Sequence, residues 1–225
     1  MMTLKWEPSL LNDIQVRILG SLIEKELITP DYYPLTLNAL TNACNQKSNR
    51  DPVLNIDETT IIRALESLKD MHLVGTISGA GIRHQKYRHN FGSLFNLSKD
   101  EIAILCVLML RGYQTLGEIR NRTERMFEFE SLEQVEEVIN KLIQRNPESL
   151  VLKLPLQVNQ KESRYAHLLS GEPQISDIQT KKEDAVIQVE AENKKISKLE
   201  EEVRNLKNEF SDLKTQVLSF IKQFE

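Results

Sequence analysis

The sequence predicts an α+β protein, mostly helical, that consists of two tandem winged helix-turn-helix domains followed by a C-terminal coiled coil. Three observations lead to this prediction. Helical apolar periodicity alternates with short strand-like segments, the order of these segments occurs twice, and the final segment carries a heptad pattern. The predicted boundaries are residues 1–96 and 97–172 for the two winged-helix domains, 173–184 for a linker and 185–225 for a parallel coiled coil.

The first copy begins with an amphipathic helix that Asn12 or Asp13 can cap and that runs to about Glu26. Residues 29–34 contain two prolines and interrupt the helical pattern. The next elements are a helix from about Thr36 to Gln46, a third helix capped by Asp57, and a β-hairpin of residues 73–78 and 83–89 around Gly79-Ala80-Gly81.

The same order returns after residue 96. Residues 97–108 are similar to 11–22, and residues 115–119 are similar to 36–40. A third helix from Ser131 to about Gln144 and a hairpin of residues 150–156 and 164–168 complete the second copy. Three helices followed by two strands, twice, is the order of a tandem winged-helix protein.

The heptad pattern after residue 188 predicts a parallel homodimeric coiled coil. Branched or aromatic residues at a positions alternate with leucine at most d positions, a combination that favours two parallel strands. The flanking pairs are opposite in charge: Lys195 with Glu200, Glu202 with Lys207, and Glu209 with Lys214. The predicted dimerisation residues are Ile196, Leu199, Val203, Leu206, Phe210, Leu213, Val217 and Phe220.

Several long motifs carry a family resemblance. They include Tyr33-Pro34-Leu35, the stretch from Ala43 to Val53, Leu110 to Thr115, and Glu162 to Gly171. On these motifs the chain resembles the YceH-like family of bacterial tandem winged-helix proteins, from about Leu10 to Gly171. The resemblance implies the winged-helix fold, residence in the cytoplasm and a DNA-binding or regulatory role.

The charge distribution limits how such a protein can contact nucleic acid. Net charge is −4, and none of the segments 1–97, 98–172 and 173–225 is basic overall. The exposed faces predicted for both third helices carry several carboxylates, which oppose the release of counterions that drives phosphate binding. Any nucleic-acid contact must therefore come from local basic clusters on loops and wings.

The candidate residues for binding nucleic acid or a protein partner are amide and basic side chains in four places. These are the end of the second helix with the loop after it, the first wing, the second helix of the second copy, and the second wing. They are Asn42, Asn45, Gln46, Lys47, Asn49, Arg50, Arg83, His84, Lys86, Arg88, Arg120, Arg122, Arg125 and Arg164. The alternative for the asparagines is local capping of a long loop, and for the arginines a solvated helix face.

Nothing in the sequence argues for catalysis, a cofactor or a metal site. The histidines lack the spacing of a metal site, and Gly79-Ala80-Gly81 lacks the third glycine of a dinucleotide fingerprint. Cys44 and Cys106 each lie in an apolar helical pattern, so we expect buried free thiols. No apolar run is long enough for a membrane span, and the chain is expected in the cytoplasm.

Two functional hypotheses follow from the sequence. The first is a non-enzymatic, regulatory-type homodimer that contacts nucleic acid weakly through wings and loops. The second is an interaction module whose winged helices dock a protein partner. The acidic third helices and the negative net charge are also consistent with this second hypothesis. The sequence names neither a DNA target nor an effector.

Overall fold

The computed structural model describes residues 10–78, 84–156 and 160–173, together with residues 198, 201–204 and 207. The chain divides into two compact units, residues 1–186 and 187–225, and each is described by itself. Among the described residues, no helix is long and apolar enough to cross a membrane.

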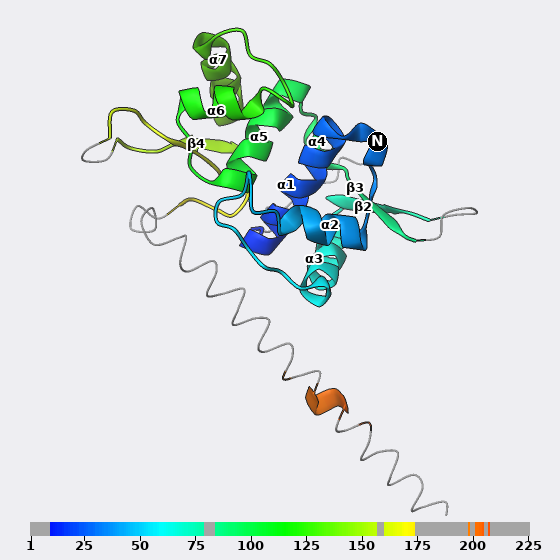
Figure 1. Ribbon diagram of the computed structural model, residues 1–225. Coiled ribbons are helices and arrows are strands. Elements are labelled where there is room, and N and C mark those ends of the chain that lie inside the picture. The colour runs from blue at the N-terminus through cyan, green and yellow to red at the C-terminus, as the bar shows by residue number, and fades with distance from the viewer. Residues whose placement is uncertain are drawn as a thin grey trace, which may run out of the picture. The chain divides into compact units, whose positions relative to one another are not determined.

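The first half of the first unit combines helices with a small antiparallel sheet (Figure 1). In chain order it consists of α1 (Asp13–Ile28), the 3-10 helix η1 (Pro30–Tyr32), β1 (Leu35–Thr36), α2 (Leu37–Cys44), α3 (Glu58–Asp70), β2 (Val74–Ile77) and β3 (Lys86–His89). The strands pair in the order β1-β3-β2. Side chains set where each α-helix begins: Asn12 forms a capping box with Gln15, and Thr36 and Asp57 cap α2 and α3.

The second half repeats this order after the short helix α4 (Phe91–Phe95). It consists of α5 (Lys99–Arg111), α6 (Leu116–Thr123), α7 (Leu132–Ile143), β4 (Val151–Lys153) and β5 (Tyr165–His167). Strands β4 and β5 pair antiparallel, and Gln114 forms an isolated antiparallel bridge with Tyr165 of β5. Gln114 therefore lies beside β5 as β1 lies beside β3.

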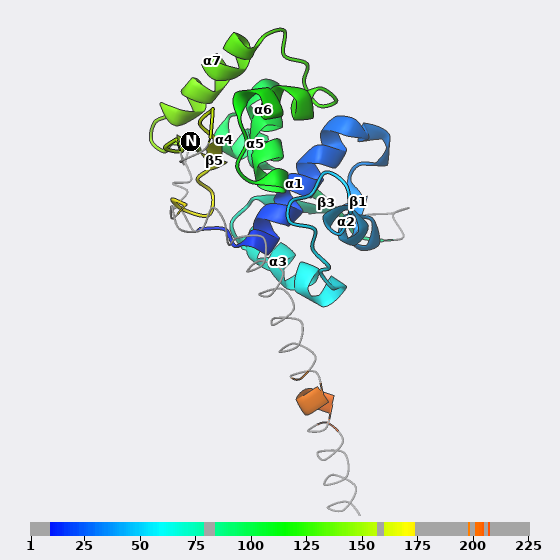
Figure 2. The same ribbon diagram turned by 60° about the vertical axis from the view of Figure 1, so that its left-hand side comes forward.

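Helices α1 and α5 pack against each other and join the two halves (Figures 1 and 2). Residues 14–24 of α1 and 103–110 of α5 are all buried, as expected of helices that are covered on every side. Gly20 permits the close approach, because a Cβ at this position would lie 2.9 Å from Cδ2 of Leu110. The Sγ of Cys106 donates to the Gly20 carbonyl at 3.4 Å. The two halves thus share one core.

The predicted α+β class is confirmed, and helices predominate over strands among the described residues. The six predicted helices of the first unit are present, although α2 ends at Cys44 rather than near Gln46. Strand β4 ends at Lys153, short of the predicted Leu156, and Pro155 has no N–H to continue a ladder. The sequence did not predict β1 or α4.

Of the second unit, the structure describes helical residues at 198, 201–204 and 207. Val203, one of the predicted dimerisation residues, is 49% exposed in the single chain. The other predicted dimerisation residues lie outside the described residues: Ile196, Leu199, Leu206, Phe210, Leu213, Val217 and Phe220. The coiled-coil dimer therefore stays a prediction.

Candidate functional site

Arg50, in the connection between α2 and α3, is buried. Its side chain is 0% exposed and pairs with Glu24 of α1 at two points, with Nη1–Oε1 at 3.0 Å and Nη2–Oε2 at 2.7 Å. It also donates from Nε and Nη2 to the Ala43 carbonyl at 3.1 and 2.9 Å. These bonds use its donors inside the protein, so the structure contradicts the prediction that Arg50 contacts a partner at the surface.

The environment of Glu24 shows how this buried pair is stabilised. Burial alone would raise the pKa of Glu24, but the hydrogen bond and charge of Arg50, with Lys25 at 3.3 Å, hold that pKa below its ordinary value. The ionised carboxylate therefore holds Arg50, and with it the connection between α2 and α3, against α1.

The asparagine and glutamine side chains near this connection serve different roles. Asn45 bonds the buried backbone of Ile56 twice, donating to its carbonyl at 2.8 Å and accepting from its N–H at 2.8 Å. This bears out the alternative of a local anchor for the loop. Gln46 accepts a hydrogen bond from Lys25 at 3.4 Å. Three further candidates are exposed: Asn42, Lys47 and Asn49, of which Asn42 also bonds Asn38 and Asn49 also bonds Arg111.

Strand β3 carries Lys86 and Arg88, two of the basic residues of the first wing. Tyr87 is buried and lies under Nζ of Lys69 at 5.4 Å, while Arg88 and His84 are exposed and Lys86 is half-buried. The strand is held to α1 and to the segment between η1 and β1, because His89 pairs with Glu26 and its backbone N–H donates to Tyr33 Oη at 2.7 Å. The predicted contact Arg83 lies outside the described residues.

The arginines of the second half are mostly engaged by the protein. Arg120 donates to the carbonyls of Phe129 and Glu130 at 3.3 and 3.0 Å, and so holds the loop before α7. Arg122 and Arg164 both reach Glu118, at 3.4 and 3.2 Å. Arg125 is exposed. Arg120 is thus a loop anchor, whereas Arg122 and Arg164 form a pair around one carboxylate.

The third helices have acidic outer faces, as the sequence indicates. On α3 the exposed charged residues are Glu58, Arg63, Glu66 and Asp70, and on α7 they are Glu133, Glu136, Glu137 and Lys141. Each face also exposes an apolar side chain, Ile62 at 39% and Leu132 at 42%. Neither face suits a phosphate backbone.

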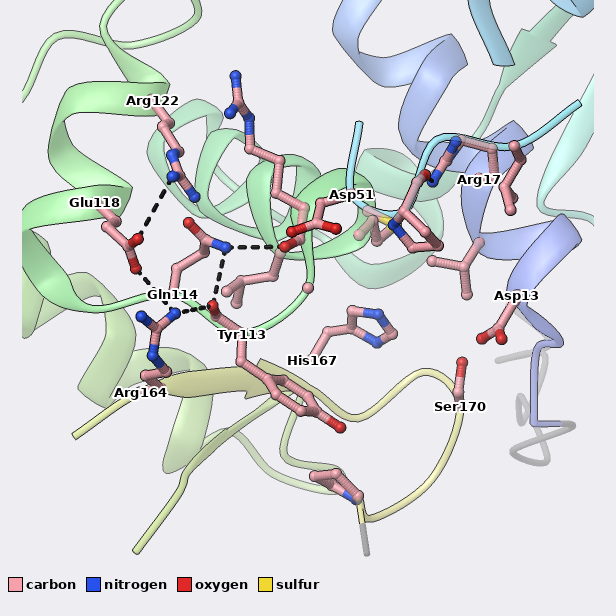
Figure 3. A pocket seen from close by; sticks show the side chains of 18 of the residues that line it. Asp13, Arg17, Asp51, Tyr113, Gln114, Glu118, Arg122, Arg164, His167 and Ser170 are labelled. Atoms are coloured by element: carbon pink, nitrogen blue, oxygen red, sulfur yellow. Dashed lines mark hydrogen bonds and ion pairs between the residues drawn. The ribbon is translucent and has the colours of Figure 1, made fainter. Parts of the chain in front are cut away.

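A cavity of about 530 Å³ lies between the two halves (Figure 3). Its walls come from the start of α1, the loop at residues 51–54, the end of α5, helix α6, and the segment from Arg164 to Pro173. Among its described lining residues, four arginines face three carboxylates, an excess of one positive charge. The charged residues are Arg17, Arg111, Arg122, Arg164, Asp13, Asp51 and Glu118.

Buried polar groups concentrate at this cavity. Gln114 is 2% exposed, and its Nε2 donates to the carbonyls of Arg111 and Tyr113 at 2.9 Å each, which identifies Oε1 as the acceptor. Within the described part of the chain, Oε1 of Gln114, Nε of Arg17 and Oγ of Ser170 are buried without a hydrogen-bond partner. Such groups are rare in native proteins, and a bound water or ion is one explanation for them.

Arg17 is a cation inside the core. It is 3% exposed and donates to the carbonyls of Cys44 and Pro52 at 3.1 and 2.6 Å. Burial, with the nearby charge of Arg50, lowers the pKa of Arg17 to about 10. Arg17 is not among the residues predicted from the sequence, although it is a lone arginine within the apolar pattern of α1.

Both cysteines are free and buried, as expected. Burial raises the pKa of the Cys44 thiol to about 11 and also raises that of Cys106, so neither thiol is activated as a nucleophile. Among the described residues no cluster of three or more His, Cys, Asp or Glu side chains is arranged to hold a metal ion.

Comparison with known proteins gives the family. Residues 11–160 match the family model described as "Protein of unknown function, DUF480". The chain is 53% identical to the UPF0502 protein of Geotalea uraniireducens over 217 residues, which cover 96% of this chain and 98% of the relative. It is 44% identical to a UPF0502 protein of Vibrio atlanticus over 218 residues, covering 95% and 99%. The chain therefore belongs to the DUF480/UPF0502 family of bacterial proteins.

Proposed function

We propose that this chain is a non-enzymatic, regulatory-type protein that contacts nucleic acid through the wing of the first of two winged helix-turn-helix domains. The topology supports the fold assignment. Three helices, an antiparallel hairpin and an additional strand in the order β1-β3-β2 are arranged as in a winged helix. The second half has the same element order, with the Gln114 bridge in the place of β1.

The observation that carries the proposal is the distribution of charge over these elements. The exposed faces of α3 and α7 are acidic, which opposes insertion into a groove. On β3, by contrast, Tyr87 faces the core while Lys86 and Arg88 alternate with it on the other side. Contacts from this strand to the phosphate backbone position a protein on a duplex without selecting its sequence.

The proposed homodimer strengthens such weak contacts. A parallel coiled coil would hold two wings together at a high effective concentration. The affinity of the dimer for one duplex would therefore exceed the affinity of a single wing. The exposure of the apolar Val203 side chain in the single chain supports a partner helix at this position.

The test is retardation of genomic DNA fragments by the full-length protein over a range of salt concentrations. The double variant Lys86→Gln/Arg88→Gln should bind more weakly. The slope of log affinity against log salt should fall by about two for each protomer that engages the DNA, about one per lost phosphate contact. The matched control is Lys141→Gln, which removes an exposed lysine from the acidic helix α7 and should change nothing. Absence of binding at low salt, or an unchanged slope in the double variant, would contradict the proposal.

Docking of a protein partner is the second candidate, favoured by the exposed Ile62 and Leu132 on the acidic third helices. If this candidate is right, a protein partner should stay bound to the chain in nuclease-treated lysate. The variants Ile62→Asp and Leu132→Asp should lose that partner. The matched control is Val53→Asp, which places the same change at an exposed apolar residue outside these helices.

A further inference from the structure

We infer that the cavity between the two halves is a binding site for a small organic anion, held by Arg122 and Arg164. Nothing in the family description assigns a ligand to this chain. The inference concerns a different surface from the wing and does not depend on nucleic-acid binding.

The size and composition of the cavity fit a small molecule. Its volume of about 530 Å³ lies within the range of ligand pockets, roughly 300–1,000 Å³. One part of the wall is apolar, formed by Val16, Leu54, Leu108 and Met109. Such a wall accepts the carbon skeleton of a ligand, while a few converging polar groups fix its orientation.

The polar part of the wall is organised around Glu118 (Figure 3). Its Oε1 accepts from Arg122 at 3.4 Å, and its Oε2 accepts from Arg164 at 3.2 Å and from the Thr115 N–H at 2.9 Å. Two guanidinium groups thus share one carboxylate that is also engaged as a helix cap. The pair keeps one uncompensated positive charge, and both arginine side chains are only about one-third exposed, at 31% and 34%.

Backbone hydrogen bonds position Arg164, and Glu118 links Arg122 to it. Nη1 of Arg164 donates to the Tyr113 carbonyl at 2.8 Å, the same carbonyl that accepts from Gln114 Nε2. Gln114 is in turn fixed by backbone hydrogen bonds with Tyr165 in both directions, at 3.1 and 2.8 Å. Arginines held in this way are preorganised for a carboxylate or phosphate, because their planar donors match two anionic oxygens.

A buried polar atom without a partner points to the same ligand chemistry. Oε1 of Gln114 is an acceptor and suits a hydroxyl or N–H group beside the anionic group. Oγ of Ser170, which donates or accepts, lies across the cavity near Asp13 (Figure 3). The occupant we infer is therefore a carboxylate or phosphate ester with an adjacent hydrogen-bond donor. Because the walls come from both halves, such a ligand would bridge them.

The test measures ligand-dependent thermal stability of the full-length protein without nucleic acid. The probes are malate for the carboxylate arm and glycerol 2-phosphate for the phosphate arm, with glycerol and sodium chloride of equal ionic strength as references. We expect at least one anionic probe to raise Tm in a saturable manner, since a ligand that binds only the folded state stabilises it. The arm that responds identifies the anionic group.

The double variant Arg122→Gln/Arg164→Gln should bind the responding probe at least about tenfold more weakly. A tenfold loss is the effect of one lost charge-assisted hydrogen bond. Arg125→Gln is the matched control, because Arg125 is exposed and does not line this cavity. Circular dichroism of the ligand-free double variant checks that it is folded, and Arg164→Lys, which keeps the charge, should retain part of the affinity. No saturable shift with either probe, or an equal shift in the double variant, would overturn the inference.

Discussion

At the residue scale, arginine performs three different tasks in this chain. Arg50 is an internal anchor paired with Glu24, Arg17 is a buried cation that binds backbone carbonyls, and Arg164 joins a carboxylate at the cavity. A buried ion pair contributes little net stability compared with an apolar pair, but the loss of one partner leaves the other charge without compensation. The structural importance of Arg50 therefore lies in what its removal would expose.

Replacing Arg50 with methionine should destabilise the protein by about 3–5 kcal/mol at neutral pH, because Glu24 would stay buried without its partner. Urea denaturation measures this free energy of unfolding. The control Lys47→Met changes an exposed lysine of the same loop and should stay within about 0.5 kcal/mol of the wild type. An Arg50→Met protein as stable as this control would contradict the structural role given to the pair.

The destabilisation should also depend on pH. In the wild type the folded-state pKa of Glu24 is lowered, so its contribution to stability is present above the unfolded-state pKa and is lost as pH falls through the folded value. Without Arg50, Lys25 still favours the charged carboxylate, but the larger effect of burial favours the protonated form. The difference between wild type and Arg50→Met should therefore be largest near neutral pH and shrink as pH falls below about 5.

At the element scale, the connection from α2 to α3 is an ordered part of the fold. Asn45 at the C-terminal end of α2 bonds both backbone groups of Ile56, immediately before the cap of α3. The Asp51 N–H donates to the carbonyl of Leu110 at 2.9 Å, so α5 also holds this loop. These bonds tie a long polar segment without helix or strand to α2, α5 and the start of α3.

Asn45→Ala should cost about 1–3 kcal/mol of unfolding free energy, because the N–H and carbonyl of the buried Ile56 would lose their partner. Asn42→Ala is the matched control, since Asn42 is exposed and its amide bonds the side chain of Asn38 in the same helix. Parallel urea denaturation of both variants measures the difference. Equal effects of the two changes would show that the Asn45 bonds do not anchor the loop.

At the scale of the whole molecule, two questions are separate: how the halves of the first unit are joined, and how two chains associate. The first has a structural answer in the contact of α1 with α5 through Gly20. The second rests on the heptad pattern of the tail, and most of its residues lie outside the described ones. The parallel dimer is thus a hypothesis with a direct test.

Sedimentation of the full-length chain should give twice the monomer mass, and removal of residues 184–225 should give the monomer. The physical reason is that apolar a and d positions, among them the exposed Val203, need a partner strand to be buried. Val203→Asp in the full-length chain is a milder version of the same change and should shift the equilibrium towards monomer. The same monomeric mass with and without the tail would contradict the dimer.

Family membership and element order came from the sequence, as did the outward acidic faces of α3 and α7. These features depend on caps, periodicity and motifs within a few residues, such as Asn12 with Gln15 or Asp57 with Thr60. Short elements were missed, because β1 has only two residues and forms through pairing with β3.

Only the tertiary structure decided which basic residues are at the surface and where a cavity lies. Glu24 and Arg50 are 26 positions apart, and Glu118 and Arg164 are 46 apart, so no local pattern links them. A solvated arginine and a buried, paired one look the same in a sequence, since their difference lies in desolvation and in partners brought by the fold. The sequence by itself therefore determined the family, most of the elements and their order. The tertiary packing determined the roles of the arginines, because it alone brings each one to its partner, and it placed the cavity between the two halves.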